Sequence, residues 1–570
     1  MHKNRARVIG LVAGVGLALA AGGGNASAAQ RPEVYAITGA TVITAPGSKS
    51  LENATVVLRD GLIEAVGSDI SVPADAEIID GSGLTAWAGW IDAFSTLALK
   101  EEERPQAGGG RGGGIQAFLQ QSARAEETPT GTGHPIARVH PQYTVTDDLV
   151  ANDTKVGKHR EAGFTAALVV PRDGIYKGRS ALIALRDGTP RQMVVKADVA
   201  QEIAFGSRGF GRSYPGSLMG VISTIRQVLL DAQRAATWEE SYARNPAGIP
   251  RPETDDAYPP LQPVLSGDEP VIFEATNNRM TERALRIAQE FSLRPIIKGN
   301  GNEYEITDML AEAQVPLIVP VDYPSKPKVD DADAALDVTL QTLERWDRAA
   351  SNAAALEQAG IRFAFTADGV NNPADFVKNV RKAIEEGLSE QTALAAVTVV
   401  PAQIFGVDAI LGTVEKGKIA NLVVATGRPF AEDTEIRHVF VDGYHTEIEA
   451  KEPAGNPDAV VDPRGTWDVT MGGGQFSQQL TWTIEGEPGA YRGSSTSARG
   501  TNDFSSVELN GNALTVGLST PRGTLEVTVV IEGDNLSGSV DTPQGFSLEI
   551  TGKRTSGPGA RAGVDQGGLQ

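Results

Sequence analysis

The chain of 570 residues contains no cysteine, only 6 histidines, and fewer basic residues (51) than acidic ones (72). Without cysteine it forms no disulfide and carries no lipid on a cleavage-site thiol. The formal net charge of −21 argues against a nucleic-acid partner, because phosphate contacts need a basic face. Apolar runs long enough to span a bilayer are also missing, so we expect no membrane span.

The first 28 residues have the three parts of a secretory signal peptide. Lys3, Arg5 and Arg7 form a positive region, residues 8–21 are apolar, and Ala26-Ser27-Ala28 supplies the small residues of a cleavage site. We therefore expect cleavage after Ala28 and a periplasmic or secreted protein.

Strand-like and helix-like segments alternate between about residues 145 and 405. Ala284, Ile287, Ala288 and Phe291 fall at helical spacing, and so do three leucines, at 336, 340 and 343. Gly360 stands where a glycine would cap the C-terminus of the second of these helices. Alternation over this length favours an α/β fold built on a (β/α)8 TIM barrel.

Segments rich in short strands lie on both sides of this region. Asp60-Gly61 predicts a hairpin turn in the first of them. The last of them alternates apolar and polar residues between turns, which predicts an antiparallel all-β module, a small barrel or a sandwich. The predicted order is a signal peptide at 1–28, a composite β-sandwich from 29–80 and 409–450, the barrel at 81–408, a linker at 451–464, the all-β C-terminal module at 465–555 and a disordered tail at 556–570.

Four stretches, in order along the chain, resemble the amidohydrolase superfamily, near its imidazolonepropionase-like and dipeptidase-like members. They are residues 37–67, 79–93, 398–406 and 411–424. The resemblance covers about residues 33–445. It implies a TIM barrel with a small β-sandwich and a metal-dependent hydrolase that acts on C–N bonds, for instance in a dipeptide or a cyclic amide.

The resemblance also implies metal ligands that this chain does not have. The family's first barrel strand ends in His-x-His, whereas this chain has Phe94-Ser95-Thr96. Neither a phenyl ring nor a hydroxyl replaces imidazole as a tight zinc ligand. Ser95 also lacks a histidine base at a strand end, so we do not expect it to act as a nucleophile.

Two further ligand positions differ, and one is kept. Glu274 stands where the family has a histidine, and the next histidine position falls near Lys298. Asp368 matches the aspartate that serves the family as metal ligand and general base. None of the five histidines beyond the signal peptide is expected to end a barrel strand, and they are His134, His140, His159, His438 and His445.

Charged residues are nevertheless expected at the strand ends, namely Asp92, Glu274, Lys298, Asp322 and Asp368. Unbalanced carboxylates in such a pocket would be costly. We therefore expect Lys298 to pair with Glu274 or Asp368 and to supply the charge of the lost cation. The alternative is a carboxylate site that holds Ca²⁺ or Mg²⁺ through oxygen ligands.

Arg208 and Arg212 stand in a glycine-rich loop ahead of a helical run at 219–236. Free N–H groups and the helix dipole suit a carboxylate or phosphate ligand there. The alternative is a loop tip exposed to solvent.

Two functions remain open. In the first, the metal site is degenerate, no cofactor is held, and the protein binds a small-molecule or peptide ligand or acts as a partner subunit. In the second, an active amidohydrolase holds a divalent metal through Asp368 and Glu274, with Asp368 as base. Both are compatible with a homo- or hetero-oligomer.

Overall fold

The computed structural model describes residues 34–557 with gaps at 101–131, 152–153, 207–213, 328, 330–334, 371, 450–458, 474–475, 498–499, 521–522 and 542–546. The predicted signal peptide, the predicted anion-binding residues Arg208 and Arg212, and nearly all of the predicted tail lie outside the described residues. None of the described helices is long and apolar enough to cross a membrane.

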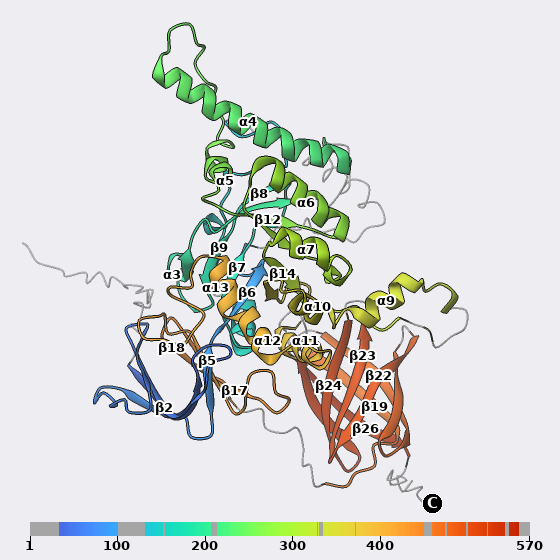
Figure 1. Ribbon diagram of the computed structural model, residues 1–570. Helices are drawn as coiled ribbons and strands as arrows, with labels where there is room; N and C mark the ends of the chain where they lie inside the picture. Colours follow the sequence, from blue (N-terminus) through green and yellow to red (C-terminus); the bar gives the residue numbers. More distant parts are fainter. Residues whose placement is uncertain are drawn as a thin grey trace, which may run out of the picture. The chain divides into compact units, whose positions relative to one another are not determined.

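One eight-stranded sheet unites strands from two distant parts of the chain (Figure 1). Its order is β18-β17-β16-β5-β1-β2-β3, and β4 pairs with β1. The strands are β1 (Tyr35–Ile43), β2 (Leu51–Arg59), β3 (Leu62–Gly67), β4 (Glu77–Asp80), β5 (Thr85–Ala88), β16 (Leu422–Ala425), β17 (Ile436–Val441) and β18 (Tyr444–Glu447). The antiparallel pair of β5 and β16 joins the two parts. The predicted hairpin turn is present, because Asp60 and Gly61 both have positive φ, 52° and 80°, between antiparallel β2 and β3.

Two mixed sheets follow, one of four strands and one of six. The first has the order β10-β9-β7-β6, with β6 (Trp90–Ser95), β7 (Phe164–Val169), β9 (Ala181–Ala184) and β10 (Val194–Lys196). The second has the order β15-β14-β13-β12-β11-β8, with β8 (Tyr176–Arg179), β11 (Gln201–Ala204), β12 (Val271–Glu274), β13 (Pro295–Lys298), β14 (Leu317–Pro320) and β15 (Phe363–Thr366). Neighbours from β11 to β15 are parallel, as are β6 and β7. β7 and β15 are short, largely apolar runs buried on both faces, as parallel strands covered by helices require, and β11 is equally buried although it contains Gln201 and Glu202.

The segment 176–184 differs from the eight parallel strands that the sequence predicts. Its first half, β8, pairs with β11 and its second half, β9, pairs with β7, and both pairs are antiparallel. Between them the Ser180 N–H donates to the carbonyl of Ala200 at 2.9 Å. This segment therefore connects the two sheets while running against its neighbours.

β15 also lies beside β6, at the other end of the strand order. The hydroxyl oxygen of Thr366 is 2.7 Å from a carboxyl oxygen of Asp92 and 2.6 Å from the carbonyl oxygen of Phe94. Polar contacts through one buried threonine thus connect the last strand of the six-stranded sheet to the first strand of the four-stranded one.

Helices separate most of these strands. They are α2 (Thr154–Glu161), α3 (Pro190–Met193), α4 (Leu218–Arg244), α5 (Gln262–Ser266), α6 (Asn278–Phe291), α7 (Thr307–Ala313), α9 (Leu340–Arg348), α10 (Asn352–Gln358), α11 (Pro373–Glu385), α12 (Glu390–Val397) and α13 (Val399–Ile404), with 3₁₀ turns η1 (Val145–Asp147), η2 (Pro259–Leu261) and η3 (Glu303–Glu305). The predicted apolar stripe of α6 is confirmed, since all four of its residues are buried.

The second predicted helix differs from the expectation. α9 begins at Leu340 and buries none of its residues, and Leu336 and Leu340 are 84% and 69% exposed. Gly360, with a φ of +69°, follows α10 rather than α9. Helical spacing of apolar residues predicts which face of a helix is apolar, but whether a neighbour covers that face depends on tertiary packing.

The C-terminal module is antiparallel and all-β, as the sequence predicts, and of the two predicted forms it is the barrel, closed by eight strands. The strands are β19 (Gly465–Gly473), β20 (Phe476–Glu487), β21 (Ala490–Ser497), β22 (Gly500–Asn510), β23 (Ala513–Thr520), β24 (Gly523–Glu532), β25 (Asn535–Asp541) and β26 (Ser547–Ser556). Apolar side chains that include Trp467 and Trp482 fill it. The guanidinium of Arg554 lies 4.3 Å from the Trp467 ring centroid and donates to the backbone oxygens of Asp462 and Arg464.

Candidate functional site

Charged side chains stand at one end of the parallel strands, as the sequence predicts. Glu274 is the last residue of β12 and Lys298 the last of β13. Asp322 and Asp368 each follow two residues after the end of β14 and β15. Because carboxyl ends of neighbouring parallel strands meet at one edge, these four residues gather there.

Lys298 pairs with Asp368. Its Nζ lies 2.7 Å from Asp368 Oδ2, and the Asp368 side chain remains 40% exposed. The backbone N–H of Asp368 donates to the hydroxyl oxygen of Thr366 at 3.0 Å, which fixes the turn after β15. The ion pair expected for Lys298 is therefore present, and its partner is Asp368 rather than Glu274.

Glu274 has a partner that the sequence analysis missed. Lys177, in β8, forms an ion pair with Glu274, and the Lys177 side chain is only 5% exposed. A signal was available, because Lys177 interrupts the apolar run Ile175-Tyr176 in a strand, and a lysine is almost never fully buried without a partner. The reversed direction of β8, which brings Lys177 beside β11 and β12, could not be read from the sequence.

Both lysines contact the ring of Phe94. The Nζ atoms of Lys177 and Lys298 are 5.8 Å and 5.2 Å from the centroid of its ring. A ring face attracts ammonium groups at this distance. The residue at the family's first histidine position thus contacts two cations of the chain instead of binding a metal.

The other residues of that triplet have local roles. The Ser95 hydroxyl accepts the backbone N–H of Leu97 at 3.1 Å, and Ser95 is buried. Thr96 is exposed, and its carbonyl accepts from Arg172 at 3.3 Å. Ser95 therefore has the environment of a turn residue and not of an activated nucleophile.

Two more carboxyl groups near this site have raised pKa values. Glu202, in β11, is fully buried. Burial raises its pKa well above the ordinary value, the Glu274 charge adds to this, and the Lys177 charge opposes it. Burial and the Asp368 charge raise the pKa of Asp322, while Lys298 and Arg345 oppose the change. The pKa of each of these two acids is thus raised by a neighbouring carboxylate and lowered by a neighbouring cation.

Asp92 is the third acid with a raised pKa. It is 1% exposed, and burial raises its pKa to about 7, although Thr366 and the backbone N–H groups of Phe94 and Ala367 hydrogen-bond to it. Asp92 lies beneath the charged cluster and holds β6 against β15.

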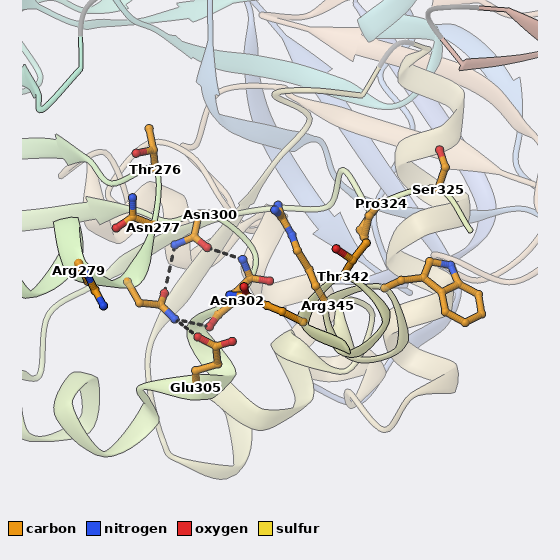
Figure 2. Close-up of a pocket in the computed structure, with 13 residues that line it drawn as sticks. Thr276, Asn277, Arg279, Asn300, Asn302, Glu305, Pro324, Ser325, Thr342 and Arg345 are labelled. Atoms are coloured by element: carbon orange, nitrogen blue, oxygen red, sulfur yellow. Dashed lines mark hydrogen bonds between the residues drawn. The ribbon is translucent and has the colours of Figure 1, made fainter. Parts of the chain in front are cut away.

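A cavity of about 640 Å³ opens beside these strand ends. It is lined by the loops that follow β12, β13 and β14, and by one side of α9 (Figure 2). The lining residues are Thr276, Asn277, Asn278, Arg279, Asn300, Asn302, Glu305, Pro324, Ser325, Gln341, Thr342, Arg345 and Trp346. Nearly all of them are polar, so the cavity suits a polar ligand.

Comparisons with known proteins relate the chain to one family. The sequence model of the amidohydrolase family matches residues 339–461. A solved amidohydrolase from Thermotoga maritima MSB8 aligns with 72% of this chain and 99% of its own length, at 25% identity and a TM-score of 0.56. The chain is thus similar to the amidohydrolase family in sequence over residues 339–461 and to a solved amidohydrolase in fold.

Other solved members of the superfamily are more distant. A prolidase in complex with N-methylphosphonate-L-proline aligns with 73% of this chain and 100% of its own at 15% identity, with a TM-score of 0.43. A Xaa-Pro dipeptidase with bound methionine has the same coverages, 14% identity and a TM-score of 0.42. Similarity at this level carries no information about the site. Among curated protein sequences, none matches the chain.

The resemblance to the family implies a group of metal-ligating side chains. Within the described part of the chain, no three His, Cys, Asp or Glu residues form a group that could hold a metal ion. Glu274 and Asp368, the ligands expected for a carboxylate site, are each within ion-pair distance of a lysine. A divalent cation between them would face two ammonium groups.

The histidines lie elsewhere. His438 and His445, on β17 and β18, hydrogen-bond to each other at 3.0 Å. His134 is buried, and its Nδ1 accepts the backbone N–H of Ile136 at 3.1 Å. His140 contacts the carbonyl of Ala137 and His159 that of Lys155. None of the five belongs to the cluster at the strand ends.

The raised pKa of Asp92 predicts a pH-dependent stability. The pKa of Asp92 is about 7 in the folded protein, above its value in the unfolded chain. Its protonated form therefore stabilises the fold fully at a pH below the unfolded pKa. This stabilisation is lost as the pH rises to about 7. Asp92→Asn keeps the acceptor oxygen but cannot ionise. The variant should gain on the order of 4 kcal/mol relative to the wild type between pH 4 and pH 8. Urea unfolding of both proteins at several pH values measures this.

Exposed Asp69 provides the control, since Asp69→Asn should follow the wild-type pH profile. Parallel pH profiles for Asp92→Asn and the wild type would show that Asp92 stays ionised in the fold.

The two lysines should differ in their effect on stability. Lys177→Met leaves Glu274 and the buried Glu202 without a cation, so we expect a loss of about 3 kcal/mol in the free energy of unfolding. Lys298→Met leaves Asp368 partly in water and should cost about 1 kcal/mol or less. Chemical denaturation monitored by tryptophan fluorescence compares the two, with Lys100→Met, at an exposed ion pair, as control. A larger loss in Lys298→Met than in Lys177→Met would contradict this assignment.

Proposed function

We propose that this amidohydrolase-like protein binds a small polar ligand at its strand ends without catalytic metals, and that it does not perform the metal-dependent hydrolysis of its relatives. One observation carries the proposal: Lys177 and Lys298 form ion pairs with Glu274 and Asp368, and both ammonium groups contact the ring of Phe94.

The chemistry of an ammonium group explains why this change abolishes the family reaction. A bound metal lowers the pKa of a coordinated water to near 7 and polarises the carbonyl that the water attacks. An ammonium balances the charge of a carboxylate, but its three N–H donors offer no coordination site for water. Charge balance at the strand ends is thus kept while the means of activating water is lost.

The strand order supports a barrel of the family's kind as the frame of this site. β8–β9 connects the four-stranded and six-stranded sheets, and Thr366 connects β15 to β6. We infer a closed ring of eight strands, with one strand reversed relative to a (β/α)8 barrel. Ligands of such barrels bind at the carboxyl ends of the strands, which is where the polar cavity opens.

The competing function, hydrolysis with Asp368 as base on a carboxylate-bound metal, would require both lysines to withdraw. Lys298 and the aspartate form a 2.7 Å ion pair, and Lys177 is buried against Phe94 and Glu274. The competing function therefore has less support than ligand binding.

Elemental analysis of the full chain after incubation with Zn²⁺ or Mn²⁺ and desalting tests the proposal. We expect far less than one metal ion per chain. The double variant Lys177→Met/Lys298→Met, in which Glu274 and Asp368 lose their partners, should retain more metal than the wild type. One equivalent of metal in the wild type, lost in Asp368→Ala, would instead overturn the proposal and establish the metal site that the competing hydrolase requires.

We propose, in addition, that the protein acts outside the cytoplasm. The support is the charged, apolar and small-residue pattern of residues 1–28. Intact-mass analysis of the protein recovered from a bacterial periplasm or culture medium should give a chain that starts at Ala29. A cytoplasmic protein that keeps residues 1–28 would refute export.

A further inference from the structure

We propose that the polar cavity binds an anionic saccharide, a sugar that carries ring hydroxyls and a carboxylate. This inference rests on the proposed function, because it names the ligand class of the same site. It is carried by the side chains that line the cavity and by the contacts that hold them in place.

Side-chain amides form one wall of the cavity and are fixed by hydrogen bonds to one another. The Asn278 amide donates to Glu305 Oε2 at 2.7 Å and to the carbonyl of Asn302 at 3.0 Å. Its oxygen accepts from the amide of Asn300 at 3.2 Å, and the Asn300 oxygen accepts from Asn302 at 2.7 Å. Such a network presents donors and acceptors in a set arrangement before a ligand arrives.

A buried carboxylate holds the loop that carries two of these amides. Glu303 is fully buried, and one of its oxygens accepts the backbone N–H groups of Asn300 and Gly301 at 2.5 Å and 3.0 Å. Its other oxygen accepts from the Asn352 amide at 2.7 Å. Gly299 allows this approach, because a Cβ there would lie 2.3 Å from Glu303. Glu303 is therefore a positioning residue for the wall.

Two arginines, Arg279 and Arg345, line the cavity together with one carboxylate, Glu305, so the lining carries one more positive charge than negative. No carboxylate in the described part of the chain forms an ion pair with either arginine. In the view of Figure 2 they lie on opposite sides of Asn300. Arg279 belongs to the first turn of α6, whose N-terminus adds a partial positive charge and has no acidic residue in its first turn. On a chain of net charge −21, this local excess favours an anionic ligand.

The amides and the absence of aliphatic lining select a saccharide among anions. A hydroxyl both donates and accepts, and an amide side chain offers both functions in one plane. The lining contains no Leu, Ile, Val, Phe or Met, and Trp346 is its only aromatic residue. A peptide with apolar side chains would find no apolar subsite here, whereas the C–H face of a sugar ring can stack on one indole.

Titration calorimetry on the full chain with trigalacturonate, neutral maltotriose and the dipeptide Asp-Asp tests the proposal. We expect trigalacturonate to bind at least tenfold more tightly than the other two. Arg279→Met and Arg345→Met should each weaken trigalacturonate binding at least tenfold. Arg286→Met is the matched control, because Arg286 lies on the same helix α6, pairs with Glu282 and is outside the cavity; it should bind as the wild type does.

Equal binding of maltotriose would overturn the requirement for an anion, and tighter binding of Asp-Asp would assign the cavity to acidic peptides. No binding of any of the three, or binding unaffected by both arginine substitutions, would overturn the proposal. None of these outcomes changes the result of the metal analysis. The proposal of a saccharide ligand and the proposal of a metal-free site can therefore be refuted independently.

Discussion

Charge balance at the carboxyl ends of the parallel strands is the constraint on which this site depends. Glu274, Asp322 and Asp368 are brought to one edge by the strand order, and low-dielectric surroundings make uncompensated carboxylates costly. Metals supply the counter-charge in the family's pattern. Here Lys177 and Lys298 do so, and both contact the ring of Phe94. The two lysines and their carboxylates therefore depend on each other, since a lysine without its carboxylate, or the reverse, would leave a charge unpaired.

Much of the fold and part of the site could be predicted from the sequence. The alternation of apolar and polar residues and the Asp60-Gly61 turn depend on local backbone geometry. The hairpin of β2 and β3 and the antiparallel strands of the C-terminal module could therefore be predicted. Lys298 could be placed at a strand end because the apolar run ahead of it ends there. Asp368 could be placed through the resemblance to the family.

The rest depends on contacts between distant segments. The reversed segment 176–184 and the ion pair of Lys177 with Glu274 depend on which strands become neighbours. The spacing of apolar residues in the sequence does not show in which direction a strand runs in the sheet. The cavity is likewise assembled from three loops and α9. Its asparagines and arginines, such as Asn300 and Arg345, are ordinary loop and helix-surface residues in the sequence and acquire a common role only in space.

The composite sheet has a consequence for how this chain is made. β5 and β16 are hydrogen-bonded neighbours, yet roughly 330 residues separate them. During synthesis, β1 to β5 emerge long before the strand that completes them. Until β16 arrives, one edge of β5 exposes unpaired backbone groups, which is the kind of edge that other chains can join. A factor that shields this edge in the nascent protein would therefore protect it from pairing with other chains until β16 is made.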